Sequence, residues 1–227
     1  MARASVLLVE RRSASFPSDG AVNRTTLSPV SLRRPLPYDP EWAARFEEEA
    51  ALLRVTLAPW LTEDVHHVGS TSIPGMWAKP VIDMIAGVQD LEASRAAFEP
   101  LSDLGYQYKE HRRDAHAFAK PPNRPTQWDE THHLHLTVPG SELWRERLAF
   151  RDALRADPAL RAEYSDWKIQ HYGRMSASPA SPKRPFVERV LASQGITLKP
   201  DDQRLTDAAV NARRASRPRI PALSDQL

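Results

Sequence analysis

The chain has 227 residues, a length that fits one ordinary domain with tails or at most two small domains. Hydrophobic residues make up 41% and charged residues 26%, which excludes a wholly disordered or collagen-like chain. Cysteine is absent, so disulfides, thiolate metal sites and thiol nucleophiles are excluded, and a reducing, cytoplasmic setting is expected. The longest apolar runs are far shorter than the roughly 18 residues of a membrane-spanning helix, so no membrane contact is expected.

The net charge of +2 is unevenly distributed. Residues 1–34 carry six basic and two acidic residues, residues 199–227 carry six and four, and the middle of the chain carries 19 and 23. A mildly acidic middle argues against nucleic acid as a partner. The tails are rich in Arg, Ser and Pro, so we predict disorder over 1–34 and 198–227 and a folded domain over 35–197.

Helical and extended patterns alternate along this middle part. Trp42, Phe46 and Ala50 follow a helical spacing over residues 41–57, with Asp39 as a suitable cap. The other expected elements, in chain order, are a strand at 65–68, a loop or one-turn helix at 69–76, a strand at 79–88, a helix at 91–104, strands at 106–108, 115–119 and 134–138, and helices at 143–155, 158–172 and 182–193. Early strands followed by helices predict a mixed α+β or α/β layer.

The turn over residues 69–76 is the first candidate binding element. Backbone N–H groups in a Gly- and Ser-rich turn can cradle a phosphate, particularly at the start of a helix. A Walker-type loop is excluded, because five residues separate Gly69 from Gly75 and Met76 follows the second glycine. An ordinary turn with two glycines is the alternative.

Asp83 is the second candidate, because it lies inside an otherwise apolar strand. Burying a carboxylate costs several kcal/mol unless it pairs with a cation or lies at the open end of the strand. Magnesium, which binds carboxylates and substrate phosphates together, is one possible partner. An ion pair with Lys79 is the other.

The segment over residues 67–83, HVGSTSIPGMWAKPVID, closely resembles the signature of the GrpB family, an uncharacterised family of the nucleotidyltransferase superfamily. Three further segments are similar to family motifs: PYDPEW at 37–42, HHLHL at 132–136, and FRDALR at 150–155 with Lys168. The resemblance covers roughly residues 30–195. The same module is known fused behind dephospho-coenzyme A kinase.

The resemblance implies a nucleotidyltransferase-like small mixed sheet with flanking helices and a helical C-terminal part. It also implies that Gly69 and Ser70 bind a nucleoside triphosphate and that a strand carboxylate binds a metal. Members of the superfamily usually carry a second acid two residues after the first. Here that position is Ile85, which puts two-metal catalysis in question.

Two histidines offer a possible replacement for the missing acid. His133 and His135 are two residues apart, so on a strand they share one face and could ligate a metal or hold a phosphate. Imidazole ligands would favour manganese or zinc over magnesium, or direct contact with phosphate. A hydrogen-bonded polar seam is the alternative.

The sequence therefore predicts a candidate nucleotidyltransferase that binds a nucleoside triphosphate with magnesium or manganese and transfers a nucleotidyl group to an unknown acceptor. The expected nucleotide contacts are Gly69, Ser70, Thr71, Ser72, Lys79 and Arg151, and the expected metal-binding and catalytic residues are Asp83, His133 and His135. The alternatives are a catalytically weak nucleotide-binding module, motivated by Ile85, a metal-dependent phosphohydrolase using the two histidines, and an adaptor that docks partners through its Arg-bearing tails.

Overall fold

The computed structural model describes residues 35–121, 129–171 and 183–198; both predicted tails lie outside these ranges except for Leu198. The elements in chain order are α1 (Glu41–Leu57), β1 (Leu61–Val68), the short 3-10 helix η3 (Ser70–Ser72), β2 (Ile82–Val88), the 3-10 helix η4 (Ala93–Ala97), α2 (Phe98–Asp103), β3 (Gln107–Arg112), β4 (Ala115–Lys120), β5 (His132–Thr137), α3 (Glu142–Ala156), α4 (Pro158–His171) and α5 (Arg184–Ser193).

The strands form one mixed sheet in the order β1-β2-β5-β4-β3. Strands β2 and β5 are parallel, while the neighbouring pairs β1–β2, β5–β4 and β4–β3 are antiparallel. In the parallel pair, Asp83 lies opposite His133 and Ile85 lies opposite His135. The predicted mixed sheet with flanking helices is therefore confirmed.

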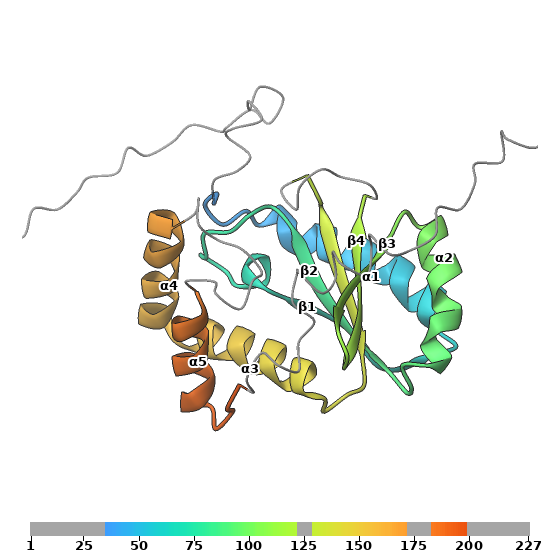
Figure 1. The fold of residues 1–227 in the computed structure, drawn as a ribbon. Coiled ribbons are helices and arrows are strands. Elements are labelled where there is room, and N and C mark those ends of the chain that lie inside the picture. Colours follow the sequence, from blue (N-terminus) through green and yellow to red (C-terminus); the bar gives the residue numbers. More distant parts are fainter. Residues whose placement is uncertain (1–34, 122–128, 172–182, 199–227) are drawn as a thin grey trace, which may run out of the picture.

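Helices cover both faces of the sheet (Figure 1). Helices α1 and α2 pack on one face, where alternate residues of β2 such as Met84 and Ala86 join Trp42 in a large apolar core. Because successive strand residues point to opposite faces, Ile85 lies on the other face, packed with Leu143 of α3. Asp83 and His133 have the same parity as Ile85, so they also face the C-terminal helices.

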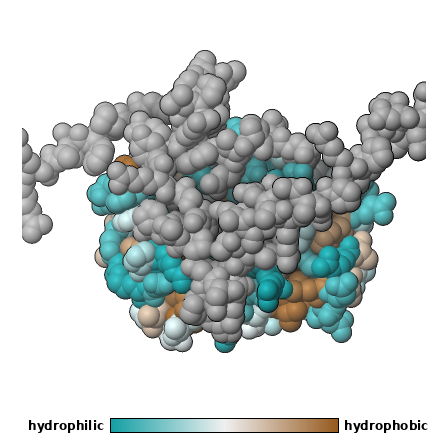
Figure 2. All heavy atoms as spheres, viewed as in Figure 1, coloured by the Kyte–Doolittle hydropathy of each residue, from teal (hydrophilic) through white to brown (hydrophobic). Residues whose placement is uncertain are grey.

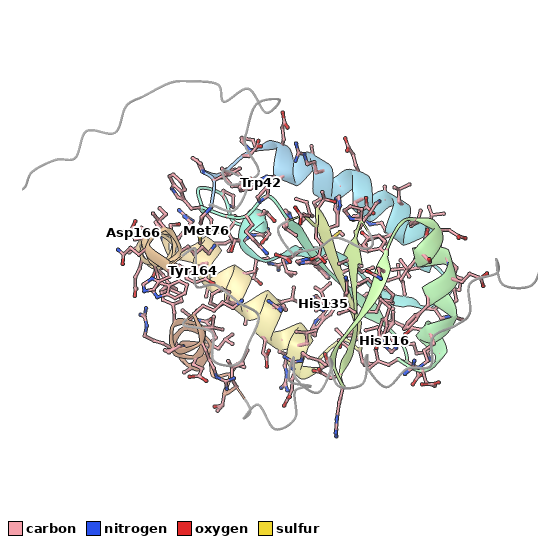
Figure 3. All side chains as sticks on the ribbon, turned by 45° about the horizontal axis from the view of Figure 1, so that its top comes forward. Trp42, Met76, His116, His135, Tyr164 and Asp166 are labelled. Atoms are coloured by element: carbon pink, nitrogen blue, oxygen red, sulfur yellow. The ribbon has the colours of Figure 1, made fainter. Side chains whose placement is uncertain are left out.

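A second apolar cluster joins the C-terminal helices to residues 73–76, the second half of the turn over residues 69–76. Tyr164 of α4 and Phe186 of α5 stack with ring centroids 4.6 Å apart, and Ile73 and Met76 from the turn pack in the same cluster. Figure 3 shows Met76 and Tyr164 close together at this contact. The turn is therefore packed against both α4 and α5.

Most predicted elements are confirmed, with differences at their ends. The predicted helix 41–57 coincides with α1. The predicted strand 79–88 begins only at Ile82, because Lys79 and Val81 form a tight turn through a backbone hydrogen bond. The predicted helix 91–104 is a 3-10 turn followed by a short α-helix.

On the face shown in Figure 2, hydrophilic residues are visible on both sides of the described part, and smaller hydrophobic patches lie among them. Within the described ranges, no helix combines the length and the apolar character that a membrane crossing requires.

Candidate functional site

The turn that begins at Gly69 lies directly against Asp83. Val68, the last residue of β1, pairs with Asp83 in the antiparallel register, so the chain that leaves β1 passes over this carboxylate. Gly69 has a φ of 68°, and a Cβ added to it would lie 2.2 Å from the Asp83 Oδ2 atom. Only glycine fits here, because it tolerates a positive φ and leaves room for the carboxylate. The structure thus brings two of the predicted site residues together.

His133 bridges two carboxylates. Its Nδ1 atom lies 2.9 Å from Asp83 Oδ1, and its Nε2 atom lies 2.8 Å from Glu130 Oε2. Ionised carboxylates only accept hydrogen bonds, so both ring nitrogens donate and the ring is an imidazolium. Burial alone would lower the pKa of His133, but the hydrogen bonds to Asp83 and Glu130 outweigh burial and raise the pKa to about 9.

Asp83 is correspondingly held in its ionised form. Partial burial would raise the pKa of this carboxyl group, but the hydrogen bond from His133 holds the pKa well below its usual range. The charges of His133, Lys79 and Arg147 lower this pKa further. The side chain of Asp83 remains 34% exposed, so a ligand can reach it.

His135 lies on the same face as His133 but not beside Asp83. It is buried opposite Ile85, one pleat further along the parallel pair. Figure 3 shows it on the side of the sheet that faces α3, whereas His116 lies on the side of α2. Of the two predicted histidines, only His133 contacts the carboxylate.

Thr71 and Ser72 build the turn. The Thr71 hydroxyl donates to the Val81 carbonyl at 2.9 Å, so the contact of 3.0 Å with His67 requires His67 Nε2 to donate. Burial lowers the pKa of His67 to about 4, which keeps this ring neutral. Ser72 Oγ donates to the Gly69 carbonyl at 2.6 Å. Both hydroxyl side chains are largely buried and hold the turn in shape.

Lys168 of α4 holds the turn from the opposite side. Its Nζ atom donates to Ser70 Oγ and, at 2.9 Å, to the Trp77 carbonyl. It also lies 4.5 Å from the centre of the Tyr164 ring. Burial lowers the pKa of Lys168 well below its ordinary value, and only 2% of the residue is exposed. Ser70 itself is partly exposed.

Three arginines on α3 are spaced four residues apart, so they lie along one side of the helix. Arg155 donates to the Ser72 carbonyl from Nε and Nη2, at 3.0 and 2.7 Å. Arg151 donates to the His67 carbonyl at 3.2 Å and to both oxygens of Asp152. Arg151, a predicted nucleotide contact, therefore supports the backbone that leads into the turn.

Arg147, the first arginine of the three, differs from the other two. Among the described residues it forms no hydrogen bond and no ion pair, although its charge lowers the pKa of Asp83. Two lysines act on the same carboxylate: Lys79, which precedes β2, and Lys183, which caps α5. Burial and the charge of Arg147 together lower the pKa of Lys183 to about 8.

Sequence reasoning missed Glu130, Arg147 and Lys183. Glu130 reaches the site because β5 pairs with β2, and spacing along the chain does not reveal that pairing. Arg147 carried a readable signal, since the repeat of Arg147, Arg151 and Arg155 at intervals of four is visible in the sequence. We found no comparable signal for Lys183.

Comparison with protein families matches residues 35–193 to the GrpB protein family. The chain belongs to the GrpB family. UPF0157 protein YqkA of Bacillus subtilis is 38% identical over 135 residues, which is 59% of this chain and 38% of that relative. A dephospho-CoA kinase of Mycolicibacterium paratuberculosis is 32% identical over 67% of this chain and 42% of its own length. The expected relationship to these fusion proteins is confirmed.

One solved structure supports the same assignment. The crystal structure of GrpB from Enterococcus faecalis matches 70% of this chain and 94% of its own, at 30% identity and a TM-score of 0.60. Cid1, solved with its short product ApU, is only weakly similar: the identity is 10% and the TM-score 0.38, over 61% of this chain and 43% of that chain.

The GrpB resemblance implies a divalent metal at Asp83, and the donor atoms of this site do not fit one. Oδ1 of Asp83 accepts from His133, and both nitrogens of His133 carry protons and cannot ligate a metal. Over the described part of the chain, no group of three or more acidic or His side chains is arranged to hold a metal ion. Lys79, Arg147 and Lys183 add positive charge around the carboxylate, which repels a cation.

Proposed function

We propose that this GrpB-family chain is a nucleotide-binding module that holds the phosphates of a nucleoside triphosphate at the turn over residues 69–72. One observation carries the proposal: the Gly69 turn lies against Asp83, where Lys79, Arg147 and Lys183 act on one carboxylate. Such a turn offers backbone N–H groups and nearby cations to an anionic ligand. The partly exposed Ser70 hydroxyl adds a polar contact.

Rigidity of the turn supports binding. The side chains of Lys168, Arg155 and Thr71 tie it to α4, α3 and the segment before β2. A turn that is already ordered loses little conformational entropy when a ligand binds, so more of the contact energy contributes to affinity.

Two observations favour binding without metal-dependent chemistry. Ile85, which occupies the place of the second acid, is fully buried in an apolar cluster and supplies no oxygen ligand. His133 donates from both nitrogens, so it has no lone pair with which to take a proton from an acceptor or ligate a metal. The same facts argue against a phosphohydrolase built on His133 and His135. Nucleotidyl transfer to an acceptor stays a prediction.

A ligand panel tests the proposal. The melting temperature would be measured with ATP, GTP, CTP and UTP, each with and without magnesium, beside the four nucleosides as matched ligands without phosphate. A nucleotide at about one hundred times its Kd should stabilise the fold by about 2.7 kcal/mol and raise the melting temperature by a few degrees. We expect a rise with at least one triphosphate and none with its nucleoside.

Hydrogen exchange locates the binding site in the same samples. Exchange of the amides over residues 69–76 should slow when the triphosphate is bound, while exchange over 41–57 should stay as it is. Absence of a thermal shift with every nucleotide would overturn the proposed function. Slower exchange only at amides far from residues 69–76 would show that the nucleotide binds at another site.

A further inference from the structure

We propose that Arg147 and Lys183 directly contact the phosphates of the bound ligand and that their charges let a polyphosphate bind without a divalent metal. This inference rests on the proposed function and names two residues and a mode of binding for it. Both residues come from the C-terminal helices, outside the segment that resembles a nucleotide-binding signature. The ligand would therefore lie between the turn and helices α3 and α5.

The arginine series on α3 is the first argument. Arg151 and Arg155 share one side of the helix with Arg147. Arg151 donates to the His67 carbonyl just before the turn, and Arg155 donates to the Ser72 carbonyl within it. Arg147 lies one helical turn before Arg151, on the same side. Its guanidinium group forms no hydrogen bond within the described part of the chain, while its charge acts on Asp83. It therefore faces the carboxylate end of the site with its donors available.

Lys183 adds a second cation from a different helix. It is the N-terminal cap residue of α5, and α5 packs on α3 through the cluster that contains Leu154 and Phe186. Phe186, three residues after Lys183, lies with its ring centroid 6.4 Å from that of Phe150, three residues after Arg147. The charges of Asp83 and Arg147 both act on Lys183. Within the described residues, the side chain of Lys183 forms no hydrogen bond or ion pair, while its backbone carbonyl accepts from the Val187 amide.

Charge balance gives the third argument. The cations whose charges act on Asp83 or Glu130 include Lys79, Lys109, Arg147, Lys183 and the imidazolium of His133. These positive groups outnumber the two carboxylates. A ligand that carries several negative charges would neutralise this excess, whereas a divalent cation would increase it.

Phosphate fits these donors chemically. A guanidinium group can give two parallel hydrogen bonds to phosphate oxygens, and an ammonium group acts as a compact charge beside them. A chain of phosphates carries several charged oxygens and can pair with two cations from separate elements, whereas a single carboxylate carries only one charge. The ligand class is therefore a polyphosphate, free or as part of a nucleotide.

The test is titration calorimetry with inorganic tripolyphosphate and with the nucleotide that gives the largest thermal shift, each in EDTA and in magnesium. Wild type should bind both ligands in EDTA. Arg147→Gln and Lys183→Gln should each weaken binding about tenfold, as expected for the loss of a hydrogen bond to a charged group. Arg147→Lys keeps the positive charge and should weaken binding less than Arg147→Gln does. Arg145→Gln changes an exposed arginine on the same helix and is the matched control with unchanged affinity.

The outcomes separate the two proposals. If wild type binds no phosphate compound under any condition, the proposed function fails. If wild type binds but Arg147→Gln and Lys183→Gln, folded as judged by their melting temperatures, bind as tightly as wild type, the roles of these residues are overturned and the proposed function stands. Binding of the nucleotide only when magnesium is present would overturn the metal-independent mode.

Discussion

Gly69 has a positive φ and lies against the oxygen of a buried strand's carboxylate, so two separate constraints act on one position. The resemblance to the GrpB signature allowed us to predict that this glycine and Asp83 belong to one site. The resemblance also grouped His133 with Asp83, but as metal ligands and not as the hydrogen-bonded pair that the structure shows. That contact depends on a parallel pairing between segments fifty residues apart, which no local pattern encodes.

Gly69→Ala is expected to lower the free energy of unfolding by about 3 kcal/mol, since the new Cβ adds a collision with Asp83 to the strain of a positive φ. Urea denaturation measures this loss. Gly140→Ala is the matched control, because Gly140 has a φ of 79° and no atom within 4 Å of the added Cβ. The control should lose about 1 kcal/mol from backbone strain alone. Equal losses in the two variants would show that the collision is absent.

His67 should make the fold sensitive to acid. Burial lowers its pKa to about 4, from about 6.5 in an unfolded chain, so between these values the unfolded chain binds more protons. The free energy of unfolding therefore falls as the pH drops from 6.5 through 4, by about 3 kcal/mol from this group. His67→Phe keeps a ring beside Phe46 and cannot titrate. Urea denaturation across this pH range should show a smaller acid-induced loss of stability in the variant. An unchanged loss would show that His67 does not cause the acid sensitivity.

Secondary structure was predictable where one face of an element is buried. Helix α1 has a clear apolar stripe, and its predicted bounds match. Strand β1 begins four residues earlier than predicted, because its first residues, such as Glu63 and Asp64, are polar and exposed at the edge of the sheet. Residues 91–104 follow a helical spacing, yet Pro100 supplies no backbone N–H and the regular helix is short. Patterns thus reveal buried faces better than edges and ends.

Arg155→Ala is expected to loosen the turn over residues 69–76, because α3 would lose the two hydrogen bonds to the Ser72 carbonyl. The site is partly exposed, so we expect the free energy of unfolding to fall by about 1 kcal/mol. Hydrogen exchange over 69–76 should become faster, while exchange over α1 should change less. Arg145→Ala removes an exposed arginine from the same helix and serves as the control. Equal exchange in both variants would mean that Arg155 does not brace the turn.

The whole molecule consists of a helix-covered sheet and a C-terminal helical part that share the candidate site. The mixed α/β layering was predictable from the order of strands and helices, and the small mixed sheet with flanking helices from the resemblance to the GrpB family. The way α3, α4 and α5 contact the turn was not, since it depends on side chains such as Arg155 and Lys168 that reach across the fold. Both parts therefore contribute residues to the site. A substitution that disrupts the C-terminal helices should also disturb the residues of the site that lie on the sheet.

Phe186→Ala tests this coupling. Phe186 is nearly buried against Tyr164, and its removal should lower the free energy of unfolding by about 3 kcal/mol or more. Phosphate binding should weaken as well, because α5 carries Lys183 at its start. Leu52→Ala, at a half-exposed position of α1, should cost much less and leave binding as in wild type. Urea denaturation and calorimetry measure both effects, and intact binding in a strongly destabilised Phe186→Ala would argue against coupling.

The strand order also has a consequence for how the chain is made. Strand β5 is the last strand to leave the ribosome, yet it occupies the middle of the sheet, between β2 and β4. Until residue 137 has been synthesised, β1–β2 and β3–β4 can form only as separate two-stranded pairs, each with an apolar strand unpaired at one edge. Small isolated pairs of this kind are marginally stable in water. Nascent chains that stop before β5 should therefore be the ones most exposed to aggregation and proteolysis.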